Sequence, residues 1–239
     1  RTTERILLKV GQVHAETYDE LFEATKALPW EKFIPKNGKL WVTKANSIKS
    51  KLFSPSDIQS IMKKAIVERL KQVYHMEWFP EDGAQYPIRV SILKDEVTIG
   101  LDTSGVSLHK RGYRKLTAKA PITETLAAAL IMLTPWKGDR ILVDPFCGSG
   151  TFPIEAAMMA ADIAPGLNRS FFAEQWTHLV PKKCWMDAAE DARYRIRNDI
   201  EPDIQGFDID GDVIKSAREN AKLAQVDHLL RRAHAWTEL

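Results

Sequence analysis

The stretch "DPFCGSGTFP" (144–153) decides the fold of the second half of this chain. It follows the apolar run Arg140–Val143, which we predict to be a buried strand. An acid, Asp144, ends this run, and Gly148 and Gly150 then permit positive φ angles and a close approach of other groups to the backbone. A helix follows, with a proline in its first turn, where proline is tolerated. The stretch therefore predicts a strand, a ligand-binding loop and a helix.

A second unit of the same kind follows in "PDIQGFDIDGDVIKSARENA" (202–221). Its predicted strand ends at Asp208, and its helix begins near Gly211, where Asp210 is placed to act as the cap. Two such units are typical of an α/β fold with an open, doubly wound, Rossmann-like parallel sheet, in which ligands bind above the carboxyl ends of the strands. We therefore expect Asp144 and Asp208 to lie at the same edge of one sheet.

The residues of the loop favour a positively charged ligand over a dinucleotide. The dinucleotide motif G-x-G-x-x-G has glycine where this chain has Pro153, and the carboxylate of Asp144 would repel a pyrophosphate. An ammonium or sulfonium group would instead be attracted, as in S-adenosylmethionine. Asp208 is placed to accept hydrogen bonds from ribose hydroxyls, and Ile209 to cover the adenine. A plain tight turn, with Asp144 as turn former, stays open as the alternative.

Composition limits the other function classes. The 239 residues are 44% hydrophobic and 28% charged with a net charge of +2, which fits a globular protein whose nucleic-acid affinity must come from local clusters. No apolar run approaches the ~20 residues of a membrane span. Cys147 and Cys184 have no metal or disulfide spacing, and the six histidines offer no i, i+4 pair, so we expect no metal and a cytoplasmic location.

The first part of the chain predicts a smaller α+β domain. Helical spacing marks residues 18–28 and 55–73, and "RILLKVGQV" (5–13) and "KLWVTKA" (39–45) are strand-like. The alternation in "YPIRVSILKDEVTIGLDTSG" (86–105) indicates a hairpin. We place the domain boundary after residue 115, which gives domains 1–115 and 116–239.

Four motifs resemble the THUMP-domain RNA methyltransferases, and most closely the bacterial 23S ribosomal RNA guanine-N2 branch. They are "DPFCGSGTFPIEAAMMAADIAPGLNRSFFAEQW" (144–176), "GFDIDGDVIKSARENA" (206–221), "LHKRGYR" (108–114) and "APITETLAAAL" (120–130). "LPWEKFIP" (28–35) and the helix at 55–73 are similar to the THUMP region of that branch. The resemblance implies a THUMP-like α+β domain followed by a Rossmann-like class I methyltransferase domain.

The resemblance also implies a cofactor, a substrate and a set of site residues. The methyl donor would be S-adenosylmethionine, and the acceptor would be guanosine N2 of a flipped-out base in RNA, most specifically 23S rRNA. The residues implied to bind the donor are Asp144, Phe146, Cys147, Gly148, Gly150 and Asp208, and Ile209 joins them as a candidate because of its place beside Asp208. Four alternatives remain: a non-catalytic RNA-binding protein, a tRNA methyltransferase, a DNA methyltransferase, and a nicotinamide-dependent oxidoreductase, which Pro153 and Asp144 disfavour.

A basic connector lies between the two predicted domains. "HKRGYRKLTAK" (109–119) carries Lys110, Arg111, Arg114 and Lys115 around a tyrosine. Such a cluster can neutralise phosphates and stack on a base, so these four residues are candidate RNA contacts. A solvated charge run without a ligand is the alternative.

The sequence departs from the family in two places. The family's catalytic tetrapeptide, Asn/Asp-Pro-Pro-aromatic, requires two adjacent prolines, and this chain has none. The end of the chain, "HLLRRAHAWTEL" (228–239), does not resemble the family, and the family's first strand would precede residue 1. We therefore expect the methyltransferase domain to be incomplete here and assign no catalytic residue.

Overall fold

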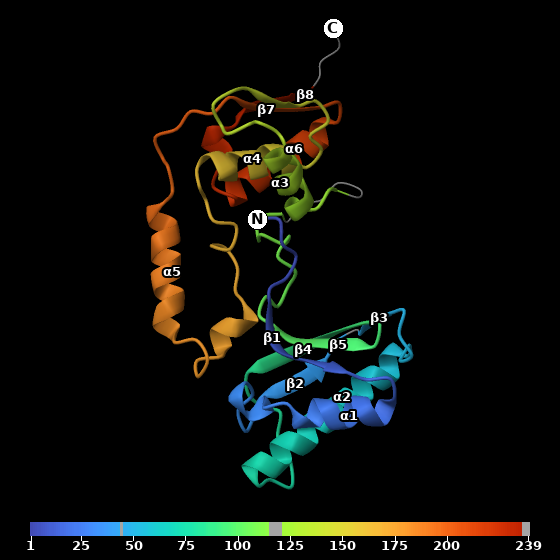
Figure 1. Ribbon diagram of the computed structural model, residues 1–239. Helices are drawn as coiled ribbons and strands as arrows, with labels where there is room; N and C mark the ends of the chain where they lie inside the picture. Colours follow the sequence, from blue (N-terminus) through green and yellow to red (C-terminus); the bar gives the residue numbers. More distant parts are fainter. Residues whose placement is uncertain (44, 115–120, 236–239) are drawn as a thin grey trace. The chain divides into compact units, whose positions relative to one another are not determined.

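The computed structural model describes residues 1–43, 45–114 and 121–235, which form two compact units (Figure 1). Unit 1 comprises residues 1–4, 106–170 and 183–239, and unit 2 comprises residues 5–105 and 171–182. The predicted boundary after residue 115 falls within residues 115–120, which lie outside the described residues, and it stays a prediction.

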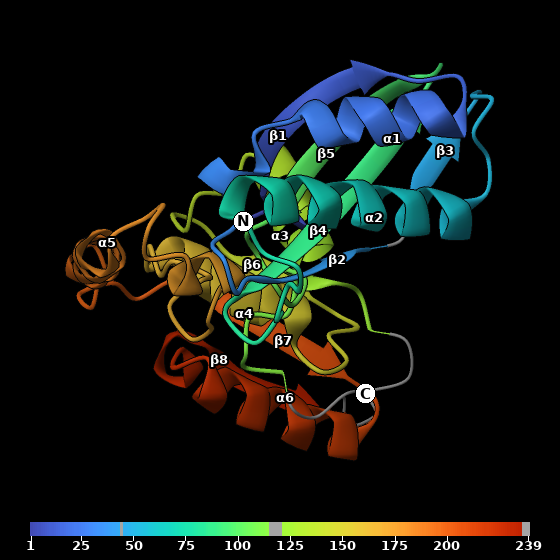
Figure 2. The same ribbon diagram turned by 90° about the horizontal axis from the view of Figure 1, so that it is seen from below.

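Unit 2 is built on a five-stranded sheet with the strand order β1-β5-β4-β2, in which β3 also pairs with β4. Its strands are β1 (Leu7–His14), β2 (Lys39–Val42), β3 (Asn46–Ile48), β4 (Gln85–Leu93) and β5 (Glu96–Asp102). Its helices are α1 (Tyr18–Ala27), the short 3-10 helix η1 (Trp30–Lys32) and α2 (Pro55–Tyr74). Helices α1 and α2 lie side by side on one face of the sheet (Figure 2).

Local sequence signals explain these elements. The side chain of Thr17 accepts a hydrogen bond from the backbone N–H of Glu20, and the carboxylate of Glu20 accepts one from the backbone N–H of Thr17, so a capping box starts α1. The predicted hairpin is confirmed, because β4 and β5 pair antiparallel across Lys94 and Asp95. These two residues have φ angles of 52° and 63°, as a two-residue turn between twisted strands requires.

A segment that is distant in sequence completes unit 2. The 3-10 helix η2 (Phe172–Gln175) leads to Trp176, which is 1% exposed and stacks on Tyr86 with 5.1 Å between ring centroids. The indole N–H of Trp176 donates to the backbone oxygen of Gln85 at 2.8 Å. Trp176 is therefore a core residue of unit 2. Trp185, by contrast, lies on α5 (Lys182–Tyr194), which has no buried residue.

Unit 1 holds the parallel sheet that the two strand–acid–helix motifs predict. Strands β6 (Leu142–Asp144), β7 (Ile204–Asp208) and β8 (Arg231–Ala235) pair in that order, all parallel. Its helices besides α5 are α3 (Glu124–Leu133), α4 (Thr151–Ala160), α6 (Gly211–Leu223) and the short η3 (Asp227–Leu229). Strand β8 is the third strand of this sheet and pairs with β7.

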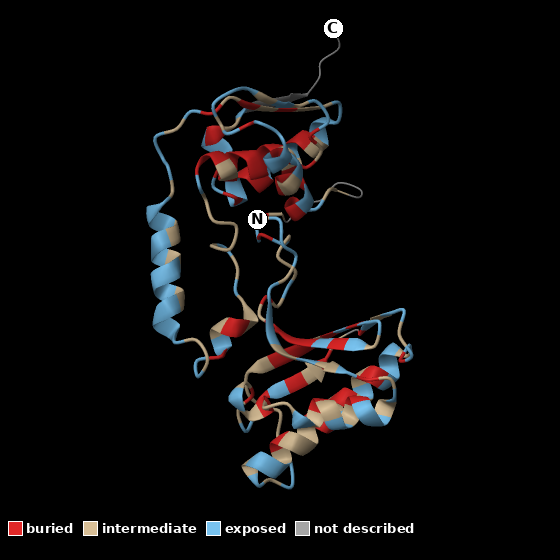
Figure 3. Ribbon diagram, in the orientation of Figure 1, coloured by how far each residue is buried: buried red, intermediate tan, exposed pale blue. Residues whose placement is uncertain are grey.

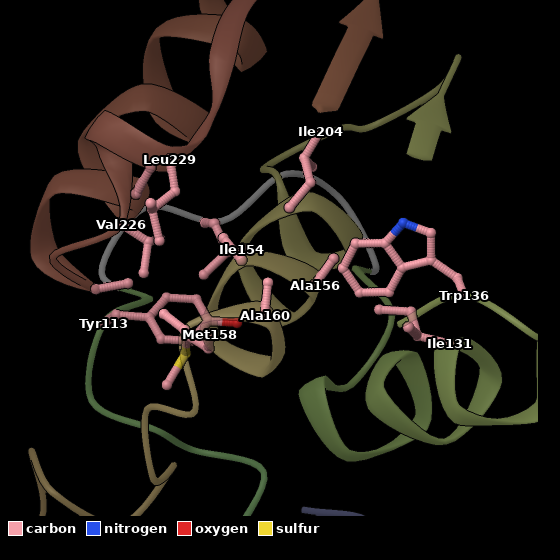
Figure 4. Packing of buried hydrophobic residues seen from close by; sticks show 14 residues of the cluster. Tyr113, Ile131, Trp136, Ile154, Ala156, Met158, Ala160, Ile204, Val226 and Leu229 are labelled. Carbon is pink, nitrogen blue, oxygen red and sulfur yellow. The ribbon is translucent and has the colours of Figure 1, made fainter. Parts of the chain in front are cut away.

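The core of unit 1 surrounds α4, most of whose residues are buried (Figure 3). Helix α4 can be buried all round because its sequence, TFPIEAAMMA, is apolar except at Thr151 and Glu155. Side chains of Tyr113, Ile154, Met158, Ile204 and Leu229 belong to one packed cluster (Figure 4). The connector thus contributes Tyr113, with 2% exposure, to the interior.

Replacing Trp176 tests whether residues 171–182 are part of the folded core of unit 2. We expect Trp176→Ala to lower the free energy of unfolding by about 3–5 kcal/mol, the cost of removing a large buried aromatic side chain. Chemical denaturation followed by circular dichroism measures it. Trp78→Ala is the matched control, because Trp78 is 77% exposed and its loss should change little. Equal stability of the two variants would contradict the assignment.

Candidate functional site

The loop after β6 has the backbone conformation that its glycines predict. Gly148 and Gly150 have φ angles of 52° and 86°. A Cβ on Gly150 would lie 3.1 Å from the Cβ of Ala217, so glycine lets the start of α4 approach α6. A Cβ on Gly148 would meet nothing within 4 Å, so the backbone there faces open space. Gly148 is therefore accessible to a ligand, whereas Gly150 is required for packing.

Hydrogen bonds join the carboxyl ends of β6 and β7. The backbone N–H of Gly148 donates to Oδ2 of Asp208 at 2.9 Å, and that of Cys147 donates to the carbonyl of Phe207 at 2.7 Å. Oδ1 of Asp208 accepts from the backbone N–H of Asp210 at 3.0 Å. The loop and the second acid therefore form one structural unit, as the parallel arrangement of the strands predicts.

The pKa of Asp144 depends on its burial and on the neighbouring carboxylate of Asp208. Burial raises the pKa of Asp144, and the negative charge of Asp208 raises it further, against a hydrogen bond that Oδ1 accepts from the N–H of Phe146. Burial and the same two carboxylates raise the pKa of Cys147 to about 12. The thiol is therefore protonated at neutral pH, which makes Cys147 a small packed side chain and a poor nucleophile. A cation placed beside these carboxylates would relieve their repulsion.

Two apolar side chains stand in solvent at this edge of the sheet. Phe146 follows β6 and Ile209 follows β7, and each is 86% exposed. Exposed apolar side chains on adjacent loops can cover the flat face of a heterocycle. Asp210 caps α6 by accepting from the N–H groups of Asp212 and Val213, which confirms its predicted role.

A cavity of about 530 Å³ lies beside the loop, between α4, α6 and the sheet. Cys147 and Gly150 line it together with Ile154 and Ala217. Asp144, Gly148 and Asp208 do not line it, so they lie at the carboxyl ends of the strands, outside this cavity.

Arg111 of the basic connector points into the interior of unit 1. Arg111 is 4% exposed, and its Nε lies 3.4 Å from Oε1 of Glu155, which also accepts from the hydroxyl of Tyr113 at 3.1 Å. Burial raises the pKa of Glu155, and Arg111 opposes that rise. This internal ion pair argues against a phosphate contact by Arg111. The single acid in the apolar helix TFPIEAAMMA was the sequence signal for a buried cation partner.

The other three basic residues differ from one another. Arg114 pairs with the buried Glu124 at 3.3 Å inside unit 1, whereas Lys110 is exposed. Lys115 lies outside the described residues. Contact of these four residues with RNA stays a prediction, and Lys110 is the exposed one among the three that the structure describes.

Within residues 1–43, 45–114 and 121–235, no helix is long and apolar enough to cross a bilayer. Among the same residues, no three His, Cys, Asp or Glu side chains are grouped so that they could hold one metal ion.

Two family models match the chain. The model described as an RMKL-like methyltransferase domain matches residues 111–236, and the THUMP domain model matches residues 15–102. YpsC of Bacillus subtilis, named as a candidate RNA methyltransferase, is 48% identical over 97% of this chain and 60% of its own length. Ribosomal RNA large subunit methyltransferase K/L of Syntrophotalea carbinolica is 38% identical over 97% of this chain and 33% of its own length.

Solved structures agree with this similarity. A Listeria monocytogenes protein, described as a predicted N6-adenine-specific DNA methylase, is 47% identical with a TM-score of 0.93 over 98% of this chain and 62% of its own. SMU.472, a candidate methyltransferase complexed with SAH, is 42% identical with a TM-score of 0.91 over 97% of this chain and 61% of its own. The predicted fold class, a THUMP-like domain before a Rossmann-like methyltransferase domain, is confirmed. The chain spans from one third to about three fifths of the length of these relatives.

The raised pKa of Asp144 predicts a pH-dependent stability. Above the ordinary value of 3.8 the unfolded chain loses this proton first, so the free energy of unfolding falls as the pH rises through the raised value. We expect Asp144→Asn to be more stable than the wild type at pH 7, with the difference vanishing below the ordinary value. Urea denaturation across this pH range measures it.

Asp212→Asn is the control for the sign of this effect. Lys215 lowers the pKa of Asp212, so this substitution should not stabilise the chain at pH 7. An Asp144→Asn variant no more stable than the wild type at neutral pH would contradict the electrostatic description of the site.

Proposed function

The chain belongs to the RMKL-like methyltransferase domain family, and on this premise we propose that it transfers a methyl group from S-adenosylmethionine to RNA. The observation that carries the proposal is the joining of Gly148 to Asp208 beside Asp144 at the carboxyl edge of the sheet. At this edge, the backbone of Gly148 is open to a ligand, the carboxylate of Asp208 can accept hydrogen bonds from hydroxyl groups, and the negative charge of Asp144 can attract a cation.

The residues at this edge fit the chemistry of the methyl donor. Each oxygen of Asp208 accepts one backbone N–H, which leaves lone pairs for the two ribose hydroxyls. Asp144 would stabilise the sulfonium or ammonium charge, and Phe146 and Ile209 would cover the adenine. S-adenosylmethionine supplies the electrophilic methyl group when bound. The cofactor prediction agrees with the family and with the 42% identical SMU.472, which is complexed with SAH.

RNA is the acceptor that the rest of the chain favours. The match to the THUMP domain falls within unit 2, and the two relatives named above are an RNA methyltransferase candidate and a ribosomal RNA methyltransferase. At finer detail we propose guanosine N2 of 23S rRNA, which rests on the motif resemblance. The name of the Listeria relative supports the competing adenine and DNA hypothesis, and tRNA is a further alternative.

The chain's own residues bind and orient in this proposal, and none is assigned to proton transfer. The thiol of Cys147 stays protonated, so the methyl group would pass directly to the acceptor amine without a covalent enzyme intermediate. A non-catalytic RNA-binding protein with the same loop is the second candidate, because the sequence lacks the adjacent prolines of the family's catalytic tetrapeptide.

Titration with S-adenosylhomocysteine tests the donor site. We expect binding by the wild type and a loss of about tenfold or more in affinity for Asp208→Asn, since hydrogen bonds to a charged group contribute about 1.5–3 kcal/mol. Asp203→Asn is the matched control. Asp203 lies directly before the amino end of β7, far along the strand from Asp208, and pairs there with Arg231. A folded wild type that releases no heat on titration would remove the enzyme hypothesis.

The reaction product separates the substrate hypotheses. The chain is incubated with labelled S-adenosylmethionine and with ribosomal RNA, tRNA or duplex DNA, and the digested nucleosides are identified by mass spectrometry. We expect N2-methylguanosine from ribosomal RNA. N6-methyladenine in DNA would contradict the RNA proposal, and cofactor binding without any methyl transfer would favour the non-catalytic candidate.

A further inference from the structure

We propose that Arg114 is a positioning residue for the methyl-donor site, which it serves by fixing the first residue of α4 and not by contacting RNA. The proposal rests on the proposed function, because it concerns the loop that would bind the donor. It gives the basic motif "LHKRGYR" (108–114) a role inside unit 1.

The guanidinium of Arg114 joins the starts of two helices. Its Nε lies 3.3 Å from Oε1 of Glu124, the first residue of α3. Its Nη2 donates both to the hydroxyl of Thr151, the first residue of α4, at 2.7 Å and to the carbonyl of Ile122 at 2.8 Å. The planar group thus satisfies a carboxylate, a hydroxyl and a backbone oxygen at once.

These contacts are shielded from solvent. The side chains of Arg114 and Glu124 are 12% and 3% exposed, and Thr151 is 4% exposed. Hydrogen bonds between a buried ion pair and its neighbours are stronger and more directional than those of a surface pair. An arginine so enclosed is poorly placed to neutralise a phosphate, but it can hold Thr151 in one position.

Thr151 transmits this position to the donor loop. It directly follows Gly150, which caps α4 with a φ angle of 86° and has little room beside Ala217. The N–H of Gly150 donates to the carbonyl of Cys147 at 2.8 Å. Gly148, which follows Cys147, donates its own N–H to the carboxylate of Asp208. A displaced Thr151 would therefore shift the amide of Gly148 and the carboxylate with it.

A second contact of the same connector supports this role. Arg111 and Tyr113 hold Glu155, one turn beyond Thr151 on α4. Residues i and i+4 of a helix lie on the same face. The connector therefore contacts one face of α4 at two successive turns, an arrangement that fixes the helix axis as well as its first residue.

The test measures S-adenosylhomocysteine affinity in a double-mutant cycle. Arg114→Lys keeps the charge beside Glu124 but cannot make all three contacts, and Thr151→Val removes only the accepting hydroxyl. We expect each variant to bind about tenfold more weakly, and the double variant to bind no more weakly than the weaker single variant, because both remove the same hydrogen bond. Arg140→Lys, at an arginine that is 59% exposed, is the matched control and should bind as the wild type does.

A merely structural role would lower the thermal midpoint and leave the affinity of the folded protein unchanged. The proposal would be overturned if the single variants bound S-adenosylhomocysteine within about twofold of the wild type. It would also be overturned if the loss of affinity in the double variant equalled the product of the two single losses. Reduced RNA binding with unchanged S-adenosylhomocysteine affinity would show that Arg114 contacts RNA instead.

Amide hydrogen exchange tests the same proposal without a ligand. We expect the amides of residues 147–152 to exchange faster in Arg114→Lys and Thr151→Val than in the wild type. Unchanged exchange there would overturn the positioning role. Absence of S-adenosylhomocysteine binding by the wild type would instead remove the proposed function, and the exchange measurement would still decide whether Arg114 orders the loop.

Discussion

One hydrogen bond organises the candidate site, namely that from the backbone N–H of Gly148 to the carboxylate of Asp208. It is possible only because β6 and β7 are parallel neighbours, so that residues 60 positions apart meet at one edge of the sheet. It fixes the open face of the glycine beside the carboxylate. The proposed binding of the donor's ribose, cationic group and adenine requires that Gly148 and Asp208 keep these relative positions.

The electrostatics of the edge follow from this arrangement. Burial has the largest effect on the pKa of Asp144 and raises it, and the negative charge of Asp208 adds to the rise. A cation beside the two carboxylates would offset this effect, which agrees with the positively charged donor of the proposal. Burial, together with the same charges, keeps the thiol of Cys147 protonated, so this residue can line the site without acting as a nucleophile.

The interior of unit 1 is organised around α4 by charges as well as apolar packing. Glu155 and Glu124 are buried, and each has an arginine of the connector as its partner. Buried ion pairs add little net stability, because desolvation offsets most of the attraction, but they define geometry strictly. Such pairs would hold α4 in a defined position, and with it the candidate binding loop that directly precedes its first turn.

The sequence alone determined the elements that depend on neighbouring residues. The hairpin turn at Lys94 and the positive φ angles of Gly148 and Gly150 are local, and each was predicted. The capping box of α1 is equally local, but it was not among the predictions. The alternation of strand, acid and helix also determined the parallel sheet, because few topologies connect such units.

Only the tertiary structure decided which surfaces meet. The inward direction of Arg111 and Arg114 and the docking of residues 171–182 on unit 2 depend on partners 10 or more positions away in sequence. A charged run has the same local pattern whether its partner is a phosphate or a buried glutamate. Its role is therefore decided by what folding places opposite it, and here folding places Glu124 and Glu155 there.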